Sequence, residues 1–124
     1  MLECPNFFPL DGKWVLMYSP MGLQERQVVY LTGDFDEQTG NFQWQTMGSV
    51  DLGFDYYAPQ HFRDEKGRDL IMAWVGSWPW MPWFRSNDAT EKLGWCGSLT
   101  LPRQICLCSD GKLASEPVQE VEQL

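Results

Sequence analysis

Basic residues are scarce in this chain of 124 residues. Nine Lys and Arg stand against 17 Asp and Glu, which gives a formal net charge of −8 at pH 7. Affinity for a phosphate backbone depends on cationic side chains that neutralise it, so this balance argues against nucleic acid and against anionic membrane surfaces as partners. No apolar run approaches the roughly 20 residues that a membrane-spanning helix needs. We therefore expect a globular protein that binds neither nucleic acid nor a membrane.

Metal-binding patterns are sparse as well. The sequence has one histidine, four cysteines, no Cys-x-x-Cys pair and no cluster of histidines. A zinc site built from Cys96, Cys106, Cys108 and His61 is an alternative, but the pattern favours reduced, partly buried thiols. No secretory signal is recognisable at the start of the sequence, which predicts a cytoplasmic location.

Helical periodicity is hard to find, and short aromatic or β-branched runs separated by turn residues take its place. Seven Trp and seven Phe favour strands, and also surfaces that stack against sugar rings. In the first group, the alternation of Asn41–Met47 indicates a half-exposed outer strand. The expected strands are 13–18, 27–32 and 41–47, with turns at 11–12 and 36–40.

A second group of strands follows, again as short apolar runs separated by turn residues. Tyr56–Phe62 contains Pro59, which predicts an edge strand. Asp69–Val75 is the most hydrophobic run of the chain and predicts a central strand buried on both faces. A charged turn at 63–68, a Trp- and Pro-rich loop at 76–94, and two short strands at 96–101 and 104–108 complete the group.

Together these groups predict an all-β fold of two four-stranded antiparallel blades of a β-propeller, about 1–52 and 53–124. A two-layer sandwich or a small barrel is the alternative from the pattern alone. Two blades do not close a ring, so apolar blade faces stay open, and we expect self-association through them.

Three motifs, in this order and spacing, carry a resemblance to a known family. They are Glu-Cys-Pro at 3–5, Asp-Tyr-Tyr-Ala-Pro-Gln at 55–60 and Gly-Trp-Cys-Gly-Ser-Leu-Thr-Leu-Pro-Arg at 94–103. The chain thereby resembles the C-terminal part of the catalytic propeller of glycoside hydrolase family 32. The resemblance implies a five-bladed propeller and hydrolysis, with retention, of a terminal β-fructofuranosyl bond. The implied substrates are sucrose, sucrose 6-phosphate or a fructan, and no cofactor is implied.

The resemblance also assigns roles to individual residues. Glu3 is the implied general acid/base, and Pro5 is expected to hold Cys4 in an extended conformation that aims it. Substrate-binding roles are implied for Asp55, Tyr57 and Trp78. The pattern favours a core role for Trp74, a packed role for His61 and a structural role for Arg103, and leaves Trp80 and Trp83 open between a sugar platform and packing.

Half of the expected catalytic apparatus is missing from the sequence. A retaining glycosidase needs a second carboxylate about 5–5.5 Å from the acid. In the family this nucleophile lies in an Asn-Asp-Pro-Asn-Gly motif, and a further acid lies in Arg-Asp-Pro, neither of which occurs here. We therefore expect a fragment that lacks the nucleophile. The alternative is a non-catalytic remnant, or a module for sugar binding or assembly, while an arabinan- or xylan-acting propeller enzyme fits the motifs less well.

Overall fold

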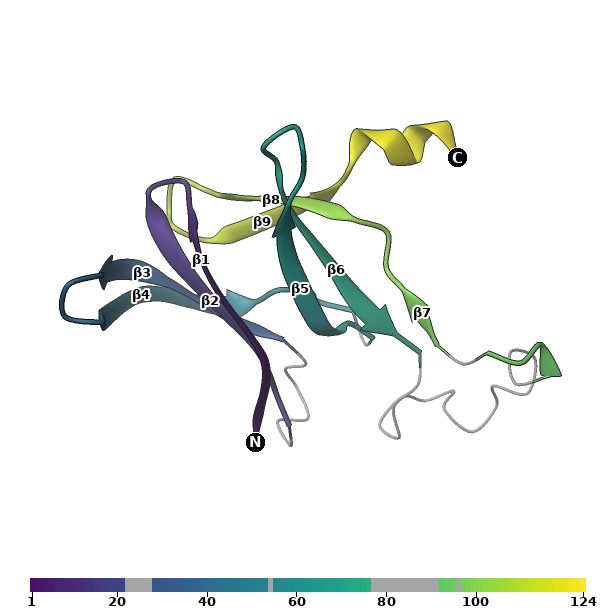
Figure 1. Ribbon diagram of the computed structural model, residues 1–124, viewed down its shortest axis with the longest axis horizontal. Helices are drawn as coiled ribbons and strands as arrows, with labels where there is room; N and C mark the ends of the chain where they lie inside the picture. The colour runs from purple at the N-terminus through teal and green to yellow at the C-terminus, as the bar shows by residue number, and fades with distance from the viewer. Residues whose placement is uncertain (22–27, 54, 77–91, 96) are drawn as a thin grey trace.

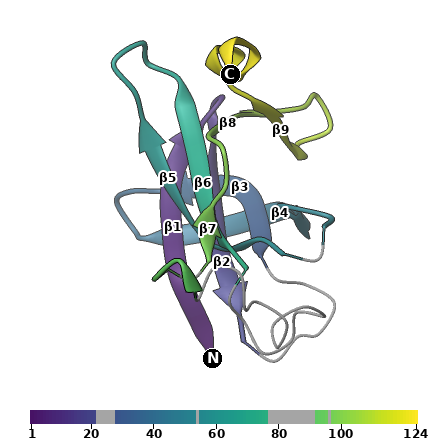
Figure 2. The ribbon, with the colours of Figure 1, turned by 90° about the vertical axis from the view of Figure 1, so that its right-hand side faces the viewer.

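A computed structural model of the chain describes residues 1–21, 28–53, 55–76, 92–95 and 97–124. These residues form two antiparallel sheets that stand side by side, followed by the short 3₁₀ helix η2 (Gln119–Gln123) (Figures 1 and 2). The predicted all-β fold is confirmed. Among the residues described, no helix has the length and apolar character to cross a membrane.

The first sheet has the strand order β1-β2-β3-β4 and is built from sequential hairpins. Asp11 and Gly12 join the first two strands with φ values of 49° and 80°, the left-handed pair that matches the twist of a tight hairpin. At the next hairpin, the Asp36 carboxylate accepts the backbone N–H of Gln38 and the hydroxyl of Thr39. The strands are β1 (Leu2–Leu10), β2 (Lys13–Pro20), β3 (Val29–Asp36) and β4 (Asn41–Ser49).

Two features of this sheet bear on the predictions. β4 lies at the edge, as its alternating pattern indicated. β1, in contrast, is a nine-residue strand that the pattern did not indicate. A register shift between Glu3 and Asn6 interrupts the alternation of inward and outward side chains in β1. The alternating pattern that indicates a strand is therefore lost where β1 begins.

The second sheet has the order β5-β6-β8-β9, and its first two strands match their predictions. β5 lies at the edge, and β6 is central, with Leu70, Ile71 and Ala73 buried. β7 and β8 both pair with β6, so the sheet has five strands where four were expected. Pro102 lies in the gap between them, since it cannot donate to the ladder. The strands are β5 (Tyr57–Arg63), β6 (Asp69–Val75), β7 (Ser98–Leu99), β8 (Arg103–Leu107) and β9 (Leu113–Pro117).

The hydrophobic core lies between the two sheets. Val15 and Met17 of β2 and Ile71 of β6 are fully buried there. Burial of such side chains contributes about 1.5–3 kcal/mol each, so this interface is the main source of stability. The cluster comprises Phe8, Leu10, Val15, Met17, Val28, Tyr30, Tyr56, Ile71, Ala73 and Ile105.

Polar contacts tie the same two sheets together around the core. Arg103 forms an ion pair with Asp51 at 2.7 Å, and its guanidinium lies 5.0 Å above the ring centre of Tyr56. The Thr32 hydroxyl donates to the carbonyl of Gly111 at 2.9 Å. The Thr32–Gly111 hydrogen bond joins the two sheets, and the ion pair of Arg103 with the segment after β4 agrees with the structural role expected of Arg103.

Candidate active site

The first strands of the two sheets carry the same irregularity. In β1 the register shifts between Glu3 and Asn6, and in β5 it shifts between Tyr57 and Gln60. Each shift inserts one extra residue, which defines a β-bulge. The sequences over these segments are Glu-Cys-Pro-Asn (3–6) and Tyr-Ala-Pro-Gln (57–60), so both bulges place a small residue before a proline.

The backbone of these bulges corrects one expectation. Cys4 has φ 48° and Ala58 has φ 50°, so both lie in the left-handed region and neither is extended. Proline disfavours a right-handed helical conformation of the residue before it, but the extra residue of a bulge still has to turn the chain. A left-handed residue before each proline provides that turn.

The two bulges bring Glu3 and Tyr57 together. Each residue directly precedes the left-handed position of its own strand. The Tyr57 hydroxyl donates to Oε2 of Glu3 at 2.6 Å, across 54 positions of sequence. The structure thus joins two residues that the sequence assigned separately to the site.

The electrostatics of this pair keep the phenol protonated. Burial, the hydrogen bond to Glu3 and the negative charge of that carboxylate all raise the pKa of Tyr57 well above its ordinary value of 10.0. Tyr57 is therefore a permanent hydrogen-bond donor at physiological pH. A charge-assisted bond of this kind is about twice as strong as a neutral one, so it fixes the orientation of the Glu3 carboxylate.

Asp55 lies beside the end of β6. A Cβ built on Gly76 would lie 3.8 Å from its Oδ2 atom, in ordinary contact. Burial raises the pKa of the Asp55 carboxyl, and the backbone N–H of Gly76 partly offsets this effect. Asp55 precedes Tyr57 by two residues in the sequence, just before β5 begins.

The other aromatic predictions have mixed outcomes. Trp78 lies outside the described residues, as do Trp80, Trp83 and Cys96. Trp74 is in β6, opposite Tyr57 and half-buried. The expected stacking platform is thus not among the parts of the chain that the structure describes.

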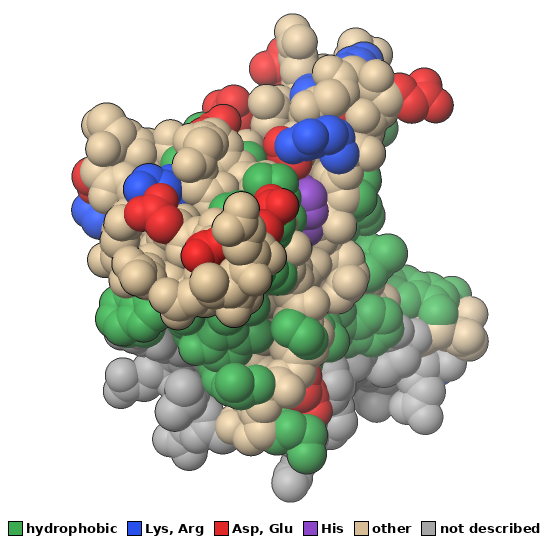
Figure 3. Space-filling model, turned by 60° about the vertical axis from the view of Figure 1, so that its left-hand side comes forward, with side chains coloured by type: hydrophobic (Ala, Val, Ile, Leu, Met, Phe, Trp, Pro, Cys, Tyr) green, Lys and Arg blue, Asp and Glu red, His purple; other side chains and the backbone are tan. Residues whose placement is uncertain are grey.

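His61 is packed and hydrogen-bonded, as predicted. Its ring stacks on Phe8 with centroids 3.6 Å apart, and its Nε2 lies 2.8 Å from Oδ1 of Asp69. Arg63 binds the same carboxylate with two nitrogens, and Figure 3 shows the histidine flanked by acidic and basic side chains. Within the described ranges, no three His, Cys, Asp or Glu side chains gather as a metal site would require.

Two polar residues near Glu3 and Tyr57 were not predicted from the sequence. Asn6 bonds to the backbone of both bulges, and the fully buried Ser19 of β2 accepts the N–H of Ala58 at 3.1 Å. Aligning Glu-Cys-Pro-Asn with Tyr-Ala-Pro-Gln at their prolines would have indicated Asn6. Ser19 has no such signal, because a serine within an apolar strand is ordinary.

The structure thus sets two antiparallel sheets beside one another, an arrangement that fits neighbouring blades of a β-propeller, and holds a carboxylate at the start of the first sheet. Residues 1–117 match the glycosyl hydrolases family 32 N-terminal domain, and the chain belongs to this family. The two sheets are accordingly blades of the family's propeller, which confirms the resemblance.

Individual relatives agree with this assignment. A sucrose-6-phosphate hydrolase of Vibrio alginolyticus is 35% identical over 136 residues, covering 100% of this chain and 26% of the relative. A raffinose invertase of Escherichia coli is 36% identical over 132 residues, with the same two shares. A family 32 β-fructofuranosidase of Bombyx mori, also solved as a mutant in complex with sucrose, superposes with a TM-score of 0.82 and 28% identity, covering 100% of this chain and 27% of that chain. The chain thus spans about a quarter of the length of the curated relatives it matches.

Proposed function

We propose that this chain supplies the acid/base half of a retaining β-fructosidase active site, with Glu3 as the general acid/base. The observation that supports this role is the 2.6 Å hydrogen bond from Tyr57 to Glu3. Through it, a residue of the second family motif orients the carboxyl group of the first. The acid of such a site donates a proton to the leaving oxygen and then removes one from water. With Oε2 held by Tyr57, Oε1 is the atom that carries this proton.

The substrate class is a terminal β-fructofuranoside: sucrose, sucrose 6-phosphate or a short fructan. The names of the relatives support this class, since they are sucrose-6-phosphate hydrolases and an invertase. Asp55, Tyr57 and Trp78 bind the fructosyl unit in this proposal, and the reaction needs no cofactor. The protein acts in the cytoplasm, and residues 1–52 and 53–124 form the last two blades of the propeller.

The nucleophile comes from residues outside this sequence. Retention requires a second carboxylate about 5–5.5 Å from the acid, and the Asn-Asp-Pro-Asn-Gly and Arg-Asp-Pro motifs of the family do not occur here. That absence also supports a second candidate function, a non-catalytic module that binds sugar or assembles with another chain. The two functions differ in whether Glu3 matters for turnover once a nucleophile is supplied.

A chimaera tests the proposal directly. Residues 1–117 would replace the matching quarter of the Escherichia coli raffinose invertase, and sucrose hydrolysis would be measured. Glu3→Gln should lower kcat by roughly 10²- to 10⁴-fold, the usual contribution of general acid/base catalysis. Glu37→Gln, which alters an exposed turn carboxylate, is the matched control and should leave kcat unchanged. A folded, active chimaera whose Glu3→Gln variant keeps full activity would instead favour the non-catalytic module.

A further inference from the structure

The Asn6 side chain makes three hydrogen bonds to the backbone of β1 and β5. Its Nδ2 donates to the carbonyl of Cys4 at 2.9 Å and to the carbonyl of Pro59 at 2.9 Å. Its Oδ1 accepts the backbone N–H of His61 at 2.9 Å. This one half-buried amide therefore bonds to the backbone of its own bulge in β1 and to two backbone groups at the bulge of β5.

These contacts bear on the distance between the two functional side chains. Glu3 directly precedes Cys4 on one bulge, and Tyr57 lies two residues before Pro59 on the other. In the described part of the chain the two sheets share no backbone ladder, so side-chain contacts of β1 and β2 with β5 help to set the spacing of these side chains. Ser19, which pairs with Glu3 in the ladder of the first sheet, adds a second link by accepting the N–H of Ala58. Asn6 differs from it in contacting the backbone within both bulges.

We propose that Asn6 is a positioning residue of this active site, whose amide locks the two bulges together and so keeps the Tyr57 hydroxyl on the Glu3 carboxylate. The inference rests on the proposed function of Glu3. An amide is required because the side chain donates to two carbonyls and accepts from one N–H. A carboxylate at this position could accept but could not donate, and it would face two carbonyl oxygens with a negative charge.

Gln60 provides a matched comparison within the same chain. It occupies in the β5 bulge the position that Asn6 occupies in the β1 bulge, directly after the proline. Its Nε2 also donates to the carbonyl of Pro59, at 3.0 Å, but its side chain is exposed and makes this contact within its own strand. Removing Gln60 takes one bond from the same acceptor without removing the bridge between the sheets.

The test reads the Glu3–Tyr57 contact itself by NMR of the chain labelled with ¹³C at the ζ carbon of its four tyrosines. Tyr57→Phe assigns the Tyr57 signal. On titration from neutral pH to about pH 3, protonation of a carboxylate bonded to the phenol moves that signal, and Glu3→Gln should abolish the step. The inference predicts that the step is lost in Asn6→Ala and Asn6→Asp and retained in Gln60→Ala.

A full Tyr57 step in either Asn6 variant would overturn the inference. So would a collapse of the whole spectrum in both Asn6 variants with Gln60→Ala unaffected, because Asn6 would then be a general folding residue. The titration requires no turnover, so it separates this inference from the proposed function. Loss of the step together with a Glu3-independent chimaera would refute the function alone. A retained step with a Glu3-dependent chimaera would refute only the role of Asn6.

Discussion

The contact between Glu3 and Tyr57 depends on the protonation of both groups. The phenol keeps its proton because burial and the neighbouring carboxylate raise the pKa of Tyr57. The phenol can therefore donate a hydrogen bond to the ionised Glu3 carboxylate when Glu3 acts as a base. It does not compete for the proton that Glu3 transfers. A second acid in place of Tyr57 would compete for that proton.

Tyr57→Phe should reduce turnover in the chimaera while leaving the fold intact. Loss of a charge-assisted hydrogen bond costs about 1.5–3 kcal/mol, which corresponds to a fall in kcat/KM of roughly 10- to 160-fold. Tyr18→Phe in β2 is a matched control with the same loss of a hydroxyl. Equal kcat/KM for Tyr57→Phe and the unsubstituted chimaera, measured with sucrose, would contradict a role for the contact.

At the scale of residues, the sequence assigned members to the site but carried no information on their arrangement. The family motifs assigned Glu3, Asp55 and Tyr57, but no local pattern says that positions 54 apart share a hydrogen bond. The conformation of Cys4 was predicted wrongly, because the rule for a residue before proline does not include the bulge. Whether these residues bind and cleave a sugar remains a prediction for the experiments above.

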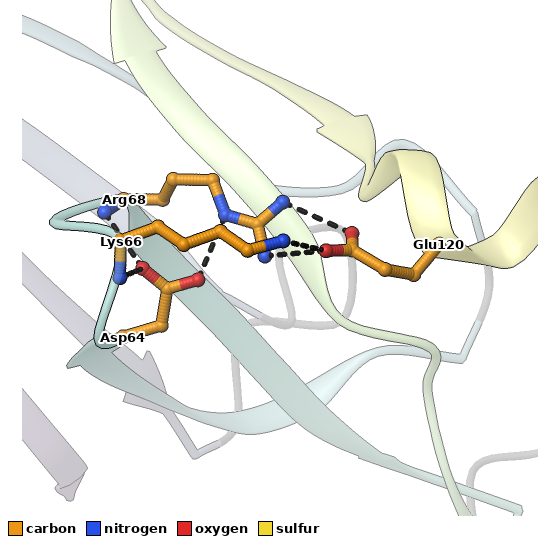
Figure 4. Close-up of polar contacts among 4 residues, drawn as sticks. All are labelled: Asp64, Lys66, Arg68 and Glu120. Atoms are coloured by element: carbon orange, nitrogen blue, oxygen red, sulfur yellow. Dashed lines mark hydrogen bonds and ion pairs between the residues drawn. The ribbon is translucent and has the colours of Figure 1, made fainter.

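Among the elements, the short helix η2 is linked to the β5–β6 hairpin by charged side chains. Arg68 donates to Glu120 through two nitrogens at 3.0 Å, and Lys66 adds a contact at 2.6 Å (Figure 4). Asp64 binds Arg68 from the other side at 2.7 Å. Since η2 has no buried residue, this network adds to the backbone hydrogen bond from Val118 to Pro102 in orienting the C-terminal segment.

Glu120 gives this network a defined dependence on pH. Its hydrogen bonds with Arg68, and then with Lys66, lower its pKa to about 2 from an ordinary 4.5. A carboxyl group whose pKa is lower in the folded state stabilises the fold above its unfolded pKa, and this contribution is lost as the pH falls. The stabilisation by Glu120 should therefore be complete above about pH 4.5 and disappear between pH 4.5 and pH 2.

Thermal unfolding of Glu120→Gln checks this dependence. The variant should have a lower Tm than the unsubstituted chain at pH 7, and the difference should shrink to zero as the pH approaches 2. Glu122→Gln, in the same helix, is the control and should show no such trend. A Tm difference that is the same at every pH would mean that the network does not stabilise the fold through the charge of Glu120.

The strands themselves followed from the sequence where their alternation or hydrophobicity was continuous. β4 and β6 are examples, and the Asp11-Gly12 hairpin followed from its turn chemistry. β1 was missed because its bulge shifts the alternation after two residues. The sequence did not indicate that β7 and β8 occupy the same place in the sheet. Both pair with β6, and such pairing between distant segments is set by the tertiary fold.

At the scale of the whole molecule, no element of the described ranges packs on the outer face of the first sheet. Phe7, Trp14, Phe35 and Phe42 form an aromatic cluster with ring centroids 4.8–5.3 Å apart, on the face opposite the core residues Phe8 and Val15. Phe7 is 39% exposed. Figure 3 shows apolar side chains in a band across one side of the molecule. Large exposed apolar patches mark interaction surfaces.

The isolated chain should therefore self-associate through this aromatic face. Sedimentation velocity should show species larger than 14.4 kDa that dissociate in Phe7→Glu and Trp44→Glu. Trp44 of β4 is 57% exposed. The control is Leu52→Glu, because Leu52 is 93% exposed but lies in the segment between the two sheets. A single monomeric species for the unsubstituted chain would show that the open face is tolerated in water.

The central claim is that residues 1–124 contain the acid/base of a β-fructosidase and not its nucleophile. The most direct measurement is glucose release from sucrose by the purified chain, with Glu3→Gln as its paired variant. The account predicts no release by either protein, alongside Glu3-dependent release by the chimaera. Release by the purified chain that disappears in Glu3→Gln would contradict it, because a second carboxylate would then come from within this chain or its oligomer.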